Sequence, residues 1–127
     1  MTPQPTVHKF FTAEEVQHYI DGIQKKNREL SSKNDELSTL AENMANAERD
    51  YNVALSRKLL TLKADGMSIT LCDKIAKGDK IIADLYFQYR VAEAIYDAGK
   101  KKIQSLAINI DSYRSLLSWA KSERERV

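Results

Sequence analysis

A run of about fifty residues without proline, from Thr12 to Ala64, most constrains what this chain can fold into. Proline breaks helix interiors because it lacks an amide hydrogen and its ring clashes with the preceding turn. Apolar residues recur through this run at alternating spacings of four and three, which is typical of a helix with one apolar seam. One long helix over residues 13–64 is therefore predicted, and it needs other helices to cover its seam.

The predicted helix has well-formed start signals. Thr12 stands at the N-cap, and Glu15, three residues later, is its reciprocal capping partner. Phe11 and Val16 stand at the two positions of a hydrophobic staple. A serine cap within residues 31–35 would instead start a second helix there. One unbroken helix is the preferred prediction.

The seam of this helix changes character along its length. Two consecutive core positions in its first half are Asn27 and Asn34. Asparagine at such positions weakens a coiled coil but fixes its register and favours two strands. Beyond Leu37, additional apolar residues widen the stripe, as in a helix that faces a folded core. The first half is therefore expected to face a second copy, and the second half to face its own chain.

A short connector with glycines at both ends follows the long helix. Gly66 is placed to take a positive φ just after the helix ends. Thr70 is the predicted N-cap of a short helix over residues 71–77, with Asp73 at its third position. Gly78 is expected to close this helix after barely two turns.

A second long helix is predicted over residues 80–121, with Asp79 as its cap. The predicted heptad positions in its first part are Ile81, Leu85, Gln88, Ala92, Ile95 and Gly99. One extra four-residue step then leads from Gly99 to Ile103, and such a step would unwind a supercoil locally. Because the connector is short, the two long helices are expected to be antiparallel neighbours.

These elements predict an all-α fold. It is expected to be an elongated antiparallel helical hairpin, or coiled coil, with a short helix at the bend. Residues 1–11 are predicted to form a flexible tail and residues 12–127 a single domain. The hairpin is expected to dimerise into a helical bundle, with an interface formed by Ile20, Ile23, Asn27, Leu30, Asn34, Leu37, Ile110, Tyr113, Leu117 and Trp119.

The sequence offers no set of residues suited to catalysis. Glu15 and His18 have the spacing of a metal-binding pair, but the only other histidine is His8, so an exposed histidine is the preferred interpretation. Cys72 lies between apolar residues with no nearby base, which favours a packing role. We expect no cofactor, no metal and no enzyme activity.

Two further features suggest a location in the cytosol. The chain contains neither an apolar run near twenty residues nor a basic and apolar leader, so no membrane association is expected. A single cysteine also suits a reducing compartment.

A net charge of +2 leaves little general attraction to nucleic acid. Three consecutive lysines at residues 100–102 point around a helix instead of along one face, so a solvated surface is the preferred interpretation. The alternative is a dimer with one basic stripe that contacts phosphates through Lys74, Lys77, Lys80, Lys100 and Lys101.

Three stretches resemble small helical proteins encoded by tailed bacteriophages and prophages: residues 66–71, 76–79 and 113–119. The resemblance covers roughly residues 48–123 and carries over no functional residues. It implies a bacterial or viral accessory protein that acts on a host machine or on phage DNA metabolism.

The sequence thus leads to two hypotheses about function. The preferred one is a non-enzymatic protein-binding accessory protein, an adaptor or inhibitor of a host protein complex. Its partners would be a second copy and an unidentified protein. The alternative is a DNA-binding or recombination accessory protein.

Overall fold

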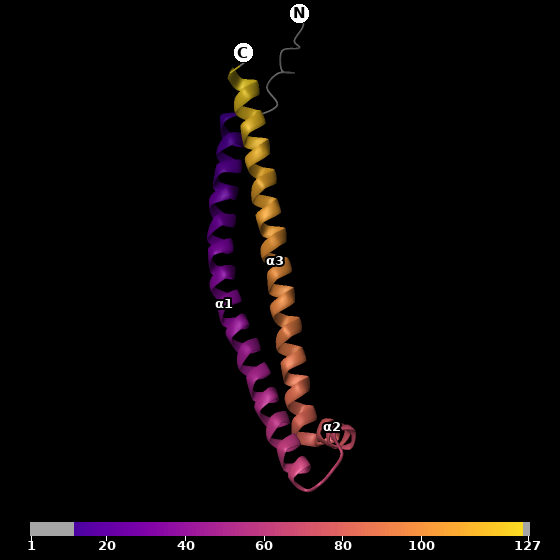
Figure 1. The fold of residues 1–127 in the computed structure, drawn as a ribbon. Coiled ribbons are helices and arrows are strands. Elements are labelled where there is room, and N and C mark those ends of the chain that lie inside the picture. The colour runs from indigo at the N-terminus through magenta and orange to yellow at the C-terminus, as the bar shows by residue number, and fades with distance from the viewer. Residues whose placement is uncertain (1–11, 126–127) are drawn as a thin grey trace, which may run out of the picture. The chain divides into compact units, whose positions relative to one another are not determined.

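The computed structural model describes residues 12–125, with side chains described for residues 12–123. The described residues form three α-helices and no strand: α1 (Ala13–Ala64), α2 (Ile69–Gly78) and α3 (Lys80–Glu125) (Figure 1). The prediction of an all-α fold is confirmed. The predicted tail at residues 1–11 and the staple residue Phe11 lie outside the described residues. None of the described helices combines the length and the apolar character needed to cross a lipid bilayer.

The chain divides into two compact units. Among the described residues, the terminal unit holds residues 12–35 and 101–125, and the central unit holds residues 36–100. Helices α1 and α3 contribute segments to both units, whereas α2 belongs entirely to the central unit.

Helix α1 is continuous, so the break considered within residues 31–35 does not occur. At its start, the amide of Glu15 donates a hydrogen bond to Thr12 Oγ1 at 3.1 Å. The amide of Val16 donates to the Thr12 carbonyl at 3.0 Å. Thr12 is therefore the N-cap, as predicted, because its side chain satisfies an amide that has no partner within the helix.

A glycine in the left-handed region ends α1. Gly66 has a φ of 88° and is the only residue with a positive φ among those that the structure describes. Its amide donates to the Lys63 carbonyl at 3.0 Å, and the amide of Met67 donates to the Leu62 carbonyl at 3.3 Å. This pair of bonds is the Schellman motif, in which a non-glycine residue at the αL position would be strained.

Helix α2 starts two residues before its predicted start at Leu71. Its N-cap is Ser68, whose Oγ accepts a hydrogen bond from the Leu71 amide at 3.3 Å, so the prediction of Thr70 as N-cap is wrong. The Ser68 carbonyl also accepts a bond from the Cys72 amide at 2.9 Å. Both hydroxyl residues are chemically suited to capping. The earlier cap adds two residues to the start of α2.

Helix α3 begins at the predicted cap and runs four residues beyond the predicted end at residue 121. Asp79 Oδ1 accepts hydrogen bonds from the amides of Ile81 at 3.0 Å and Ile82 at 3.2 Å. Its other carboxylate oxygen lies 3.7 Å from Lys58 Nζ of α1. Asp79 therefore both caps α3 and pairs with α1 within the central unit.

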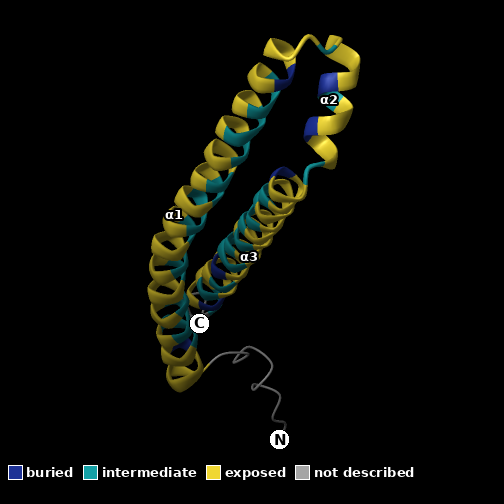
Figure 2. Cartoon of the chain, turned by 90° about the horizontal axis from the view of Figure 1, so that it is seen from below, coloured by how far each residue is buried: buried dark blue, intermediate teal, exposed yellow. Residues whose placement is uncertain are grey.

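The core of the central unit lies where its three helical segments meet. Leu62 from α1, Cys72 and Ala76 from α2, and Ile82 from α3 form one buried cluster. Figure 2 shows that α2 is buried along one side only and exposed along the other. Burial of Cys72 confirms its predicted packing role, and its Sγ lies 3.7 Å from the Met67 carbonyl oxygen. Five half-buried residues pack around this cluster: Tyr51, Ala54, Leu55, Leu59 and Met67.

The inward-facing series of α3 differs from the predicted heptad. Ile81 and Ile95 are exposed, and Tyr89 and Tyr96 take the inward positions that Gln88 and Ile95 were predicted to hold. A tyrosine ring packs against apolar neighbours while its hydroxyl reaches polar ones. The series that results has no extra four-residue step at Gly99: Ile82, Leu85, Tyr89, Ala92, Tyr96, Gly99, Ile103, Leu106, Ile110, Tyr113, Leu117 and Ala120.

In the terminal unit, two inward-facing positions of α1 also differ by one residue from the predicted seam. Asn27 and Asn34 are exposed, whereas the preceding residues Lys26 and Lys33 are half-buried. Lys26 Nζ lies 6.0 Å from the centre of the Tyr113 ring. A lysine stem of four carbons covers apolar surface while its ammonium group stays in water, which the short amide of asparagine cannot do. Asn27 and Asn34 therefore do not take part in the contact with α3.

Two helical glycines should respond differently to alanine. A Cβ added at Gly22 would lie 3.9 Å from the Tyr113 ring, whereas one at Gly99 would lie 3.2 Å from the Leu37 and Leu40 methyl groups. Because alanine is the better helix former, we expect Gly22→Ala to raise the free energy of unfolding by about 1 kcal/mol. Gly99→Ala should gain less, because both leucines must shift. Urea denaturation measures the difference, and equal gains would contradict it.

Candidate interaction surface

Large apolar side chains lie exposed on the outer side of α3 in the central unit. Phe87 is 67% exposed, Val91 40% and Ile95 49%. Ala94 and Ala98 are exposed on the same side. The spacing of Phe87, Val91, Ala94 and Ala98 is four, three and four, so they form a second stripe away from the inward series. We call the stripe of these four residues, with Ile95 beside it, the outer face of α3.

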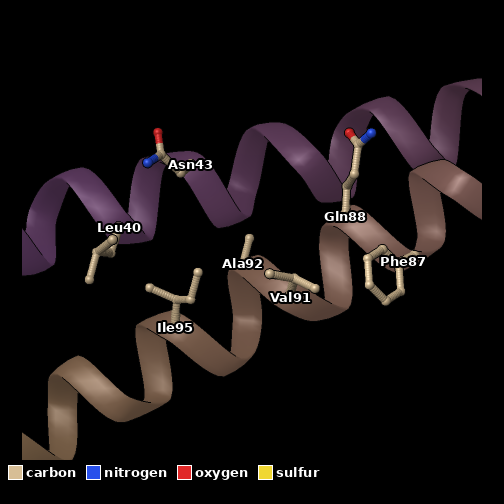
Figure 3. Close-up of a pocket in the computed structure, with 7 residues that line it drawn as sticks. All are labelled: Leu40, Asn43, Phe87, Gln88, Val91, Ala92 and Ile95. Carbon is tan, nitrogen blue, oxygen red and sulfur yellow. The ribbon is translucent and has the colours of Figure 1, made fainter.

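A shallow groove runs beside this outer face. It has a volume of about 240 Å³. Figure 3 shows Leu40 extending from α1 toward α3, and Ala92 and Ile95 extending from α3 toward α1. Side-chain amides are its only hydrogen-bonding side-chain groups among the lining residues, which are Leu40, Asn43, Phe87, Gln88, Val91, Ala92 and Ile95. Such a groove suits an apolar helix face better than a charged small molecule.

A tyrosine cluster joins α1 to α3 in the central unit. The ring centres of Tyr51 and Tyr86 lie 5.1 Å apart, and those of Tyr51 and Tyr89 lie 6.5 Å apart. The Tyr89 hydroxyl donates a hydrogen bond to Glu93 Oε2 at 3.3 Å. Arg90 lies 6.0 Å from the Tyr86 ring centre and 3.5 Å from Glu93 Oε1. These aromatic residues support helix packing.

The pH dependence of stability should reveal the environment of Tyr89. Partial burial, and then the nearby carboxylates of Glu48 and Glu93, raise its pKa. The folded chain therefore holds the phenolic proton more tightly than the unfolded chain does. The protonated Tyr89 side chain therefore contributes to the free energy of unfolding. This contribution is fully present below the pKa of the unfolded chain, near 10, and is lost as pH rises through the pKa of the folded chain. We expect Tyr89→Phe to lose less stability than the wild type above about pH 10. Urea denaturation measures the stability of both proteins, and an equal loss of stability by the variant and the wild type over this pH range would contradict the prediction.

The residues predicted to form a dimer interface have several different environments. Ile110 is 3% exposed, so it packs within the chain. Tyr113 is half-buried, and its ring centre lies 6.0 Å from that of Tyr19. Trp119 is 47% exposed. The other predicted residues are exposed at Asn27 and Asn34 and half-buried at Ile20, Ile23, Leu30, Leu37 and Leu117.

The terminal unit has its own exposed apolar residues on α3. Ile108 is 64% exposed, and Leu116 is 40% exposed. With Trp119 they lie beside the inward-facing series that includes Ile110 and Tyr113. Ile108, Leu116, Phe87 and Val91 were not among the residues predicted to form an interface. Continued along the same helix, the heptad of Phe87 and Val91 reaches Ile108 and Trp119 but not Leu116.

The candidate phosphate-binding lysines do not all carry free charge. Lys77 Nζ lies 3.2 Å from Asp73 Oδ2, and Lys100 Nζ lies 5.6 Å from the Tyr96 ring centre. Lys74 and Lys80 are exposed in the central unit, and Lys101 is exposed in the terminal unit. Half of the positive charge at Lys74 and Lys77 is therefore balanced locally by Asp73.

Metal-ligand residues do not gather in the part of the chain that the structure describes. There, no group of three or more His, Cys, Asp or Glu side chains is arranged to hold an ion. His18 is exposed, as predicted, and its ring packs at an edge against that of Tyr19.

Comparison with known proteins adds no relative: the chain matches no protein-family model, no curated protein and no solved structure.

Proposed function

We propose that this chain is a non-enzymatic protein-binding accessory protein, an adaptor or inhibitor of a host protein complex. The observation that carries the proposal is the exposure of apolar side chains along α3, above all Phe87, Val91 and Ile95. Apolar surface in water costs about 25 cal/mol per Å², and such patches mark interaction sites. A partner helix placed along the outer face of α3 would remove this surface from water.

The finer architecture is part of the same proposal. In it, α1 and α3 form an elongated antiparallel hairpin of the coiled-coil kind, which self-associates into a helical bundle. Contacts within the central unit support the antiparallel arrangement. Gly99 lies beside Leu37 and Leu40, whereas Tyr86 lies beside Tyr51, so residue numbers rise on α1 as they fall on α3.

The biological setting is proposed from sequence alone. The resemblance over residues 48–123 supports an origin in a tailed phage or prophage, and with it a place in the cytosol of a bacterial host. In this setting the terminal-unit residues Ile108 and Leu116 offer a second surface for a host protein, because both are exposed.

Affinity capture from bacterial lysate, with variants of each surface, tests the proposal. We expect proteins recovered by the wild type to be lost with Phe87→Ser or with Ile108→Ser and Leu116→Ser combined. Leu60→Ser is the matched control, because Leu60 is 69% exposed on α1, outside both surfaces. Recovery of the same proteins by all variants would contradict the proposal.

The alternative of DNA binding makes a different prediction. Contacts with six or more phosphates would lose orders of magnitude in affinity between about 50 and 200 mM salt. The pairing of Lys77 with Asp73 works against such contacts. We therefore expect no gel shift of single- or double-stranded DNA at either salt concentration. A shift at low salt that Lys74→Glu with Lys77→Glu abolishes would favour the alternative.

A further inference from the structure

Large and small side chains follow one another along the outer face of α3 in an order that is complementary to the same face of a second, antiparallel copy. Along the helix come two large residues, Phe87 and Val91, and then two small ones, Ala94 and Ala98. All four are exposed. When such a stripe meets a second copy running in the opposite direction, large residues lie opposite small ones. When the copies run in the same direction, large residues lie opposite large ones.

We infer that the outer face of α3 takes a second copy of this chain, with the two α3 helices antiparallel. This inference rests on the proposed function and names the partner of its central-unit surface. In the pairing, Phe87 lies opposite Ala98 of the second copy, and Val91 lies opposite Ala94. The twofold symmetry repeats both contacts. Alanine at two of the four positions lets the helices approach closely around each large side chain.

Charge supports the same direction and register. Continuing the heptad by three residues at each end reaches Asp84 before Phe87 and Lys101 after Ala98. The antiparallel pairing sets Asp84 opposite Lys101 of the second copy, twice in each dimer. A parallel pairing would set like charges against each other, which is unfavourable. Within the described residues, neither Asp84 nor Lys101 forms an ion pair in its own chain.

The groove beside the outer face fits this partner as well. Ile95 lines the groove and is 49% exposed. Because Ile95 follows Ala94 in the chain, the same register brings it next to Val91 of the second copy. Val91 also lines the groove, so the pairing covers the mouth of the groove on both chains.

Sedimentation equilibrium of the full chain from about 1 to 200 μM tests the inference. We expect a dimer whose Kd rises at least about a hundredfold with Phe87→Asp, because a carboxylate would be buried without a partner. The variant should fold, because Phe87 is exposed in the single chain, and circular dichroism checks this. Leu60→Asp, the matched control, should leave the Kd unchanged.

Charge reversal tests the register. Asp84→Lys alone and Lys101→Asp alone should each weaken the dimer about tenfold, and the two together should restore it. A merely structural role of either residue would not give this rescue.

Oxidation provides a second measurement in a Cys72→Ser background. Val91→Cys mixed with Ala94→Cys should cross-link, whereas Ala94→Cys chains that cross-link with one another instead would indicate a parallel dimer and overturn the inference.

Two other results would overturn it. One is a 14.5 kDa monomer throughout the concentration range. The other is a dimer that Phe87→Asp leaves intact but Asn27→Arg with Asn34→Arg dissociates, which would place self-association in the terminal unit. Neither result depends on the lysate experiment. If the chain is monomeric but Phe87→Ser still loses captured proteins, the inference fails and the proposed function stands.

Discussion

Replacing Ile82 by alanine is expected to lower the free energy of unfolding by about 3 kcal/mol. Ile82 is 3% exposed and belongs to the buried cluster with Leu62, Cys72 and Ala76. The substitution removes apolar contacts and leaves a cavity that the helices refill only in part. Because domains of this size are stable by about 5–15 kcal/mol, this loss should be obvious in urea denaturation followed by circular dichroism.

The neighbouring isoleucine provides the control. Ile81 is 70% exposed, so Ile81→Ala should change stability by no more than about 0.5 kcal/mol. The two variants remove the same atoms from adjacent positions, and only the rotation of α3 distinguishes them. Equal effects, or a larger effect at Ile81, would mean that α3 follows the heptad chosen from sequence instead of the observed inward series.

Replacing Ile110 by alanine is expected to cost a similar amount, about 3 kcal/mol, in the terminal unit. Ile110 is 3% exposed although it was predicted to face a second copy. Its packing partners lie in its own chain, so the loss should not depend on protein concentration. Thermal unfolding at about 2 and 100 μM would measure both the loss and its concentration dependence.

Ile108→Ala is the matched control for this second substitution. Ile108 is two residues away on the same helix and is 64% exposed. Its replacement should change stability by less than about 0.5 kcal/mol. A loss at Ile110 that vanishes at high concentration would show instead that Ile110 lies between two copies.

The starts of the long helices and the end of α1 could be predicted because they depend on neighbouring residues. Thr12 and Asp79 each carry a side-chain oxygen that reaches amides two or three residues ahead. Residue 66 has a positive φ, and glycine is the one residue type that adopts a positive φ without strain. The start of α2 was missed because Ser68 and Thr70 offer the same capping chemistry, and the choice between them depends on how α1 ends.

The surface with the strongest case for binding was not found from the sequence. Neither Phe87 nor Val91 was among the residues predicted to form an interface. Both lie on the outer side of α3, exposed in the single chain. One apolar heptad along a helix accounts for one face that packs against another helix. The choice of Ile81, Gln88 and Ile95 as that heptad hid the presence of a second apolar stripe.

The caps of the long helices, the absence of a break in α1 and the all-α class follow from local sequence, because caps, glycines and missing prolines act over a few residues. The rotation of each long helix about its axis depends on the partner helix. Lys26 and Tyr89 take inward positions because α1 and α3 offer surface for a lysine stem and a tyrosine ring. Hydropathy alone ranks Ile81 above Tyr89 and treats Lys26 as no more apolar than Asn27, so only packing between helices could decide which residues face inward.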